Sequence, residues 1–149
     1  MQEAGVELLA HQHDLAVGGL VELAGSLPAL TRVWRRMGAA LVTERPDLVV
    51  LIDSAGFNLP FARRVRRRCA AKILYYVAPQ VWAWRSGRIR KLAERVDRLA
   101  VIFPFEKEVY RHTPLAVDFV GHPLVDSLAP LVPLEREAAR RACGIDPSG

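Results

Sequence analysis

The sequence predicts an α/β domain built on a doubly wound parallel sheet. Four short apolar runs rich in β-branched or aromatic residues recur along the chain, at residues 48–52, 73–77, 99–103 and 116–120. Three of them are nearly continuous, which is typical of strands covered on both faces. Helical stretches separate the runs, and this alternation implies parallel strands joined by right-handed crossovers. With 149 residues, the chain has the size of one domain.

The first and last helices are predicted from the signals that end them. Residues 30–45 have an amphipathic pattern that stops at Pro46. Residues 135–143 predict a short helix closed by Gly144.

Two helices between strands are predicted from the signals that begin them. Pro60 and Pro104 each follow a strand and suit the first turn of a helix, where a missing N–H costs nothing. Glu106 and Glu108 then place negative charge near the positive end of the second helix.

The sequence has no recognisable targeting or membrane-spanning segment. Its apolar runs are shorter than the roughly 18 to 20 residues that a span needs, and residues 1–5 lack the basic and apolar regions of a signal peptide. Cys69 and Cys143 have no metal-ligand spacing and fit a reducing compartment, so we interpret both as structural. We therefore expect a cytoplasmic or peripheral protein.

Positive charge is concentrated in the middle of the chain. The net charge is +5, and residues 63–98 contain 12 Lys or Arg against 2 acidic residues. Such a surface suits nucleic acid, anionic lipid or a phosphorylated ligand, or is simply a solvated helix face. Charge alone does not choose among these.

Four segments of the chain carry a resemblance to a known family. The most specific is Pro-Gln-Val-Trp-Ala-Trp-Arg at residues 79–85, because two tryptophans separated by one residue are rare. The others are Pro-Asp-Leu-Val-Val-Leu-Ile-Asp-Ser-Ala-Gly-Phe-Asn at 46–58, Phe-Pro-Phe-Glu at 103–106 and Gly-His-Pro-Leu-Val-Asp at 121–126. In this order and spacing, the four segments closely resemble lipid-A-disaccharide synthase.

The resemblance implies the fold of a GT-B glycosyltransferase, in which two Rossmann-like domains face each other across a cleft. Residues 1–149 then correspond to the acceptor-side N-terminal domain, which we expect to be incomplete because the family's opening strand and Gly-Glu-x-Ser-Gly-Asp loop are not in the sequence. The C-terminal nucleotide-binding domain is expected to be absent too, so the chain by itself should be inactive. Ala55 and Gly56 occupy a loop where relatives often have Pro or Asp.

The resemblance also implies a reaction. Enzymes of this family transfer 2,3-diacylglucosamine from its UDP conjugate to 2,3-diacylglucosamine 1-phosphate, which forms a β-1,6 lipid A disaccharide and releases UDP. We expect these two lipids and the inner face of the inner membrane as partners, with no nucleic acid and no cofactor. No metal site is expected, because no cluster of His, Cys, Asp and Glu has metal-ligand spacing.

Asp53 is the candidate catalytic residue. It follows the first strand directly, and ligands of open α/β sheets bind at the carboxyl ends of strands. A carboxylate there could take the proton of the acceptor's 6-hydroxyl as the oxygen attacks the anomeric carbon. The alternative is an Asp that caps loop amides. Asn58 is a candidate substrate-binding and orienting residue in the same loop, although Asn in turns is usually structural.

Four further residues are candidate substrate contacts. Trp82 and Trp84 face the same side in an extended backbone and could form an apolar wall for a sugar or an acyl chain, or could instead fill the core. Arg85 could pair with a phosphate through its planar guanidinium. His122 follows the last strand, and the resemblance suggests a position at the interdomain cleft, although a lone His is more often structural.

Four apolar residues near the start of the chain are predicted to face the membrane: Val21, Leu23, Leu27 and Leu30. A Gly and a Pro interrupt this stretch, which therefore suits a short, bent element on a lipid surface. The alternative is an ordinary core helix.

Two other functions remain open on the sequence alone. One is another UDP-sugar enzyme of two Rossmann-like domains, such as a peptidoglycan glycosyltransferase or a UDP-sugar epimerase. The other is a non-enzymatic module that binds nucleotide or nucleic acid through residues 63–98. Against this module, aromatic residues are not interleaved with the arginines of residues 63–68, as they would be on a stacking surface.

Overall fold

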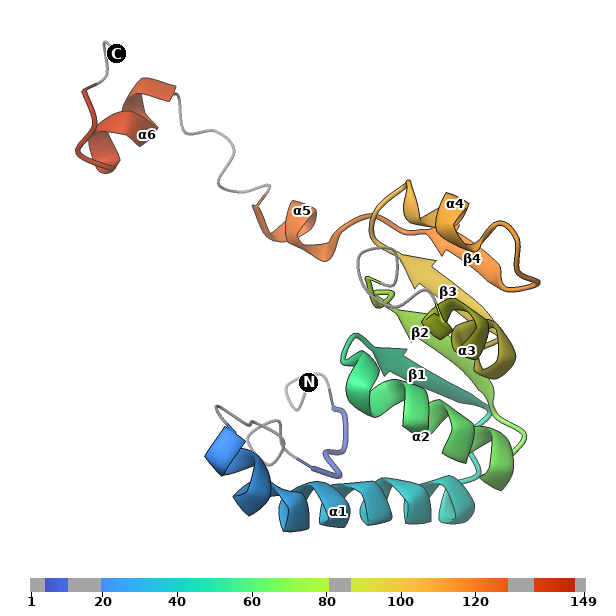
Figure 1. Cartoon of the computed structure of the whole chain (residues 1–149). Coiled ribbons are helices and arrows are strands. Elements are labelled where there is room, and N and C mark those ends of the chain that lie inside the picture. The colour runs from blue at the N-terminus through green and yellow to red at the C-terminus, as the bar shows by residue number, and fades with distance from the viewer. Residues whose placement is uncertain (1–4, 11–19, 81–86, 129–135, 147–149) are drawn as a thin grey trace.

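A single parallel sheet organises the protein (Figure 1). The computed structural model describes residues 5–10, 20–80, 87–128 and 136–146, with their side chains except those of 20–27 and 136–137. The strands pair in the order β1-β2-β3-β4, all parallel. Their bounds are Leu48–Ile52, Lys72–Tyr76, Arg98–Val101 and Ala116–Phe119. The predicted α/β class is confirmed, and β1 has the bounds that the sequence indicates.

Helices connect the strands and flank the sheet. In chain order they are α1 (Leu20–Thr43), α2 (Ala55–Arg68), α3 (Gly87–Arg95), α4 (Glu106–Tyr110), α5 (Pro123–Leu128) and α6 (Arg136–Ala142). One core cluster contains Phe61 of α2, Leu92 of α3 and Tyr110 of α4, together with Ile73 and Tyr75 of β2. The three crossover helices therefore cover the same face of the sheet (Figure 1). Burial of each large apolar side chain there stabilises the fold by about 1.5 to 3 kcal/mol.

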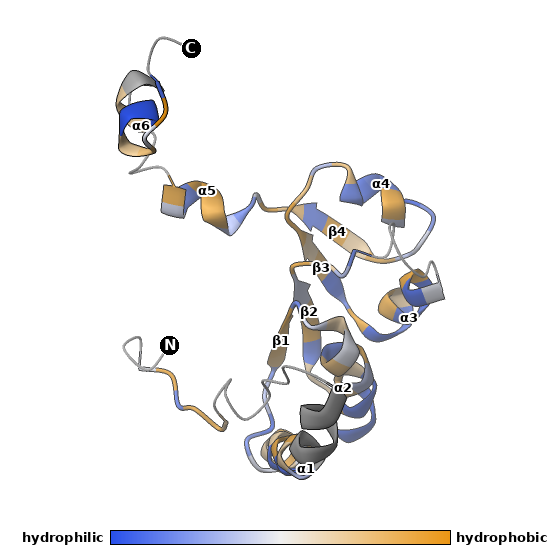
Figure 2. Cartoon of the chain, turned by 60° about the vertical axis from the view of Figure 1, so that its left-hand side comes forward, coloured by the Kyte–Doolittle hydropathy of each residue, from blue (hydrophilic) through white to orange (hydrophobic). Residues whose placement is uncertain are grey.

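The opposite face of β1 is open among the described residues. Leu48, Val50 and Ile52 are 52%, 48% and 46% exposed, whereas Leu51 on the helix-covered face is buried. Figure 2 shows this apolar character along β1. The strand order explains it, because strands that follow one another in a single direction with right-handed crossovers place every helix on one face. The described elements thus form one half of a doubly wound sheet. The expectation that β1 is covered on both faces is not met among the described residues.

Helix α1 is longer than the sequence indicates. It begins at Leu20 rather than near residue 30 and continues through Gly25 and Pro28, so the expectation of a short element is wrong. A proline removes one main-chain hydrogen bond, and the many other bonds of a 24-residue helix outweigh that loss. The second half of α1 is anchored on α2 by Trp34, whose ring packs edge-on against Phe57 and Phe61 at centroid distances of 5.2 and 5.3 Å.

The start of α2 also differs from the expectation. Pro60 lies well inside the helix rather than in its first turn, because α2 begins at Ala55. The chain turns sharply at Ser54, whose carbonyl oxygen accepts the N–H groups of Phe57 and Asn58 at 3.0 and 2.9 Å. Pro104 lies in a turn two residues before α4 rather than in the first turn of that helix, so this expectation is not met either. Gly144 follows α6 with φ 69°, as predicted.

None of the described helices combines the length and the hydropathy that a membrane crossing requires.

Candidate functional site

The carboxyl ends of the four strands lie along one edge of the sheet, and polar residues follow two of them. Asp53 comes directly after β1, and His122 follows β4. The prediction that both lie at the carboxyl edge is therefore confirmed. However, β1 and β4 are three strand spacings apart, roughly 14 Å, so the two side chains do not meet at one small group.

Asp53 sits in an uncommon backbone conformation. Its φ is 48° and that of Ser54 is 39°, both in the left-handed region, where a non-glycine residue costs about 1 to 2 kcal/mol. Its N–H donates to the carbonyl oxygen of Tyr76 at 3.0 Å, which extends the pairing of β1 with β2 by one bond. The carboxylate itself is exposed at the end of the strand.

Two buried side chains stabilise this conformation through hydrogen bonds to the backbone. The phenol of Tyr75 donates to the backbone carbonyl oxygen of Asp53 at 2.5 Å. The side-chain amide of Asn58 donates to the carbonyl oxygens of Ile52 and Asp53, both at 2.8 Å. Because these groups are buried, each hydrogen bond avoids the penalty of an unsatisfied carbonyl.

Asn58 is therefore a positioning residue. Both N–H groups of its amide are used by backbone carbonyls, and the residue is only 8% exposed. These bonds match the structural alternative stated for Asn58, whereas a role in orienting or contacting a substrate stays a prediction.

Tyr75 is the residue that sequence reasoning missed. Burial chiefly raises the pKa of Tyr75 to about 12, so its phenol remains a protonated donor at neutral pH. The signal in the sequence was a tyrosine at a strand position that faces the core, because a buried phenol needs a partner.

His122 is fixed in a turn at the start of α5. Its Nδ1 accepts the N–H of Leu124 at 3.1 Å, and its ring lies against Phe103 at a centroid distance of 5.7 Å. An accepting Nδ1 leaves the proton of a neutral imidazole on Nε2. The half-exposed His122 can therefore offer Nε2–H as a donor at the edge of the sheet.

The loop after β3 is held by a buried carboxylate. Glu106 is 1% exposed and accepts the N–H of Phe103 at 3.1 Å. Tyr110 lies one turn further along α4, and its phenol has no hydrogen-bond partner within the part of the chain that is described. Burial, and then the nearby Glu106 carboxylate, raise the pKa of Tyr110. Glu106 thus has a structural role in addition to its predicted place in the first turn of α4.

Several predicted site residues are not placed. Trp82, Trp84 and Arg85 lie outside the described residues, as do the side chains of three predicted membrane-facing positions, Val21, Leu23 and Leu27. Leu30, the fourth, is half-buried on α1. Among the described residues, no group of three His, Cys, Asp or Glu side chains could hold a metal ion.

Comparison with known proteins gives one consistent family. A sequence model described as lipid-A-disaccharide synthetase matches residues 1–148. Lipid-A-disaccharide synthase of Syntrophotalea carbinolica is 48% identical over 149 residues, and that of Geobacter sulfurreducens is 44% identical over 147 residues, each match covering 99% of this chain. Lipid-A-disaccharide synthase 1 of Legionella pneumophila strain Lens is 37% identical over 97% of this chain. The chain spans 37% to 38% of the length of these relatives.

Proposed function

The chain belongs to the lipid-A-disaccharide synthetase family, and from this membership we propose that the full-length protein is a glycosyltransferase of lipid A biosynthesis. It transfers 2,3-diacylglucosamine from its UDP conjugate to 2,3-diacylglucosamine 1-phosphate. The products are a β-1,6 disaccharide and UDP. The family match leaves the epimerase, the peptidoglycan enzyme and the nucleic-acid module without support.

In this proposal, residues 1–149 form the acceptor side of a two-domain enzyme. The relatives are more than twice as long as the chain, which leaves room for a second α/β domain that binds the nucleotide of the donor. The open carboxyl edge of the sheet then faces the cleft between the two domains, where ligands of such sheets bind. Because this edge carries Asp53, the reacting hydroxyl of the acceptor is placed at the end of β1.

Asp53 is the general base of the proposed reaction. The acceptor's 6-oxygen forms a bond to the anomeric carbon of the donor as the bond from that carbon to the phosphate oxygen of UDP breaks. The proton of the 6-hydroxyl passes to the carboxylate of Asp53, and a base of this kind contributes about 10²- to 10⁴-fold. The observation that carries the assignment is the left-handed backbone of Asp53, held from below by Tyr75 and Asn58, which leaves an exposed carboxylate at the carboxyl edge.

Four other residues are proposed as substrate contacts. Trp82 and Trp84 are proposed to form an apolar wall, and Arg85 to pair with a phosphate. His122 lies roughly 14 Å along the edge from Asp53, so its Nε2–H suits a polar group of the donor or acceptor that is remote from the reacting hydroxyl.

The protein is also proposed to attach to the inner face of the inner membrane, where both lipids reside. Val21, Leu23, Leu27 and Leu30 on α1 are the apolar contacts in this proposal. Electrostatic attraction between the basic residues 63–98 and anionic lipids would add to it.

The experiment is to purify the full-length protein and incubate it with the two diacylated glucosamine lipids. Release of UDP together with one equivalent of disaccharide supports the proposal. Release of UDP without the acceptor, or transfer to an acceptor that is not acylated glucosamine phosphate, would place the protein in another reaction class.

A further inference from the structure

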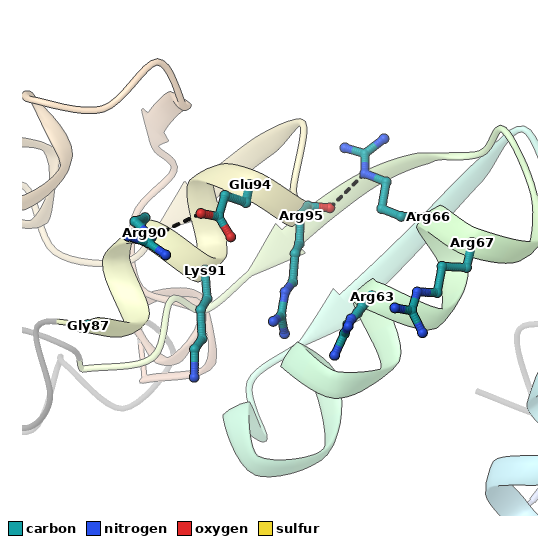
Figure 3. A pocket seen from close by; sticks show the side chains of 8 residues that line it. All are labelled: Arg63, Arg66, Arg67, Gly87, Arg90, Lys91, Glu94 and Arg95. Carbon is teal, nitrogen blue, oxygen red and sulfur yellow. Dashed lines mark hydrogen bonds and ion pairs between the residues drawn. The ribbon is translucent and has the colours of Figure 1, made fainter.

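A cleft lies between helices α2 and α3, on the outer surface of the helical layer. Its volume is about 770 Å³. Helix α2 contributes Arg63, Arg66 and Arg67 to its lining, and α3 contributes Arg90, Lys91 and Arg95 (Figure 3). Among the described residues of the lining, Glu94 is the one acidic side chain. None of the residues 53–58 at the carboxyl edge lines this cleft, so it is separate from the Asp53 site.

Part of this cluster is fixed by internal contacts. Arg66 Nε donates to the carbonyl oxygen of Arg95 at 2.9 Å, and its Nη2 lies 2.8 Å from the carboxylate of Asp97. Arg95 Nη1 donates to the carbonyl oxygen of Leu59 at 2.9 Å. These bonds join α2 to the C-terminal end of α3, so the two walls of the cleft keep a defined separation.

The acidic side chains near the cleft already form ion pairs. Glu94 pairs with Arg90 at 3.0 Å, and Asp97 pairs with Arg66. Within the described part of the chain, the side chain of Arg95 is bound to a neutral carbonyl and to no carboxylate, so its charge is not compensated there.

The side chains of three further cations have no hydrogen bond or ion pair with any residue that the structure describes: Arg63, Arg67 and Lys91. Figure 3 shows their side chains, and that of Arg95, extending to the same side of the two helices. Four like charges gathered in this way repel one another, and an anion between them would remove the repulsion.

We infer that the α2–α3 cleft binds a ligand carrying at least two phosphoryl groups. Four uncompensated cations exceed the charge of a single phosphate, and a cleft of about 770 Å³ is far larger than one. Three of the four cations are arginines, whose planar forks match phosphate oxygens in pairs. Among the residues that the structure describes, none of the side chains that line the cleft is aromatic, so the described lining favours phosphoryl groups over stacked bases.

The cleft also communicates with the start of α2. A smaller cavity of about 360 Å³ shares Gly87, Lys91 and Arg95 with it and reaches Ala55 and Gly56, next to the Asp53 turn. A ligand in the cleft would therefore lie close to the catalytic edge without occupying it. The inference does not depend on the proposed glycosyl transfer, because phosphoryl binding is measured without turnover.

The test compares a cleft variant with a charge-matched control in the full-length protein. Arg63→Gln with Lys91→Gln removes one uncompensated cation from each wall. Arg45→Gln with Lys107→Gln removes the same net charge from exposed positions outside the cleft. Inorganic tripolyphosphate is titrated calorimetrically at low ionic strength. In a second arm, co-sedimentation is measured with phosphatidylcholine vesicles with and without phosphatidic acid.

We expect the wild type to bind at least one of the two probes. Binding of tripolyphosphate points to a soluble phosphorylated ligand. Binding only to vesicles with phosphatidic acid points to two or more lipid headgroups in the cleft, because each headgroup carries one phosphate. In either case the cleft variant should bind at least about tenfold more weakly, because two charge-assisted contacts are lost, and the control should stay within about twofold. An equal loss in both variants would show attraction by net charge alone and overturn the site. Failure of the wild type to bind either probe would overturn it as well.

Discussion

The phenol oxygen of Tyr75 lies 2.5 Å from the backbone carbonyl oxygen of Asp53, so a buried strand residue holds the turn that presents the candidate base. The two residues are 22 positions apart in the sequence and meet because β2 pairs with β1 in parallel. The bond acts on the backbone of Asp53 and leaves its carboxylate exposed.

Removing this hydrogen bond should show whether Tyr75 positions Asp53 for the reaction or only stabilises the fold. Tyr75→Phe keeps the buried ring and deletes the donor, which should lower the free energy of unfolding by about 1 kcal/mol. Asp53 would then rely on Asn58 alone, so we expect kcat of the full-length enzyme to fall by about tenfold, with a smaller change in KM. Tyr76→Phe is the matched control, because the side chain of Tyr76 has no hydrogen bond with any of the described residues. Equal activity of the two variants would show that Tyr75 has only a packing role.

Because of Asp97, the free energy of unfolding should vary with pH in the acidic range. Partial burial alone would raise its pKa, but the N–H of Ile73 at 2.7 Å and the guanidinium of Arg66 outweigh this, and the pKa of Asp97 lies below its usual range. A lowered folded-state pKa adds stability above about pH 4, where the unfolded chain ionises, and that stability is lost as the pH falls through the folded-state pKa.

The measurement is urea unfolding of the wild type and Asp97→Asn at neutral pH and near pH 3. We expect the variant to be less stable than the wild type by about 1 kcal/mol at neutral pH, and this difference should become smaller as the pH falls into the acidic range. Asp126→Asn, at an exposed position of α5, is the control. A difference between wild type and Asp97→Asn that does not change with pH would contradict this account.

The apolar residues of α1 allow a test of membrane attachment. We expect the combined change of Val21, Leu23, Leu27 and Leu30 to serine to release the full-length protein from vesicles while its cooperative unfolding transition is kept. If these side chains instead belong to the core, four large-to-small changes at about 1 to 5 kcal/mol each would exceed a stability of about 5 to 15 kcal/mol. Co-sedimentation and thermal unfolding of the same variant decide between the two, and loss of the transition counts against attachment.

The parallel sheet could be predicted from the sequence because each strand is a short apolar run with β-branched or aromatic residues. The place of Asp53 followed from the same pattern, since a polar residue directly after such a run lies at the carboxyl edge. The start of α2 could not be predicted in this way. Pro60 suggested a helix beginning there, but the left-handed Ser54 turns the chain earlier.

Contacts between residues far apart in the sequence could not be predicted for a related reason. The Tyr75 bond depends on the register between β1 and β2, and the open face of β1 depends on the order of all the strands. The α2–α3 cleft depends on two helices that pack side by side, although their positive charge was already visible in residues 63–98.

The central claim is that Asp53 is the base of the reaction, and Asp53→Asn in the full-length protein tests it most directly. Asparagine tolerates a positive φ, and its backbone carbonyl can still accept from Tyr75 and Asn58, so the fold and the thermal transition should be retained. The amide cannot take the proton of the acceptor hydroxyl, so kcat for disaccharide formation should fall by about 10²-fold or more. A folded Asp53→Asn enzyme with a near-normal kcat would contradict the claim and return Asp53 to a role in shaping the turn.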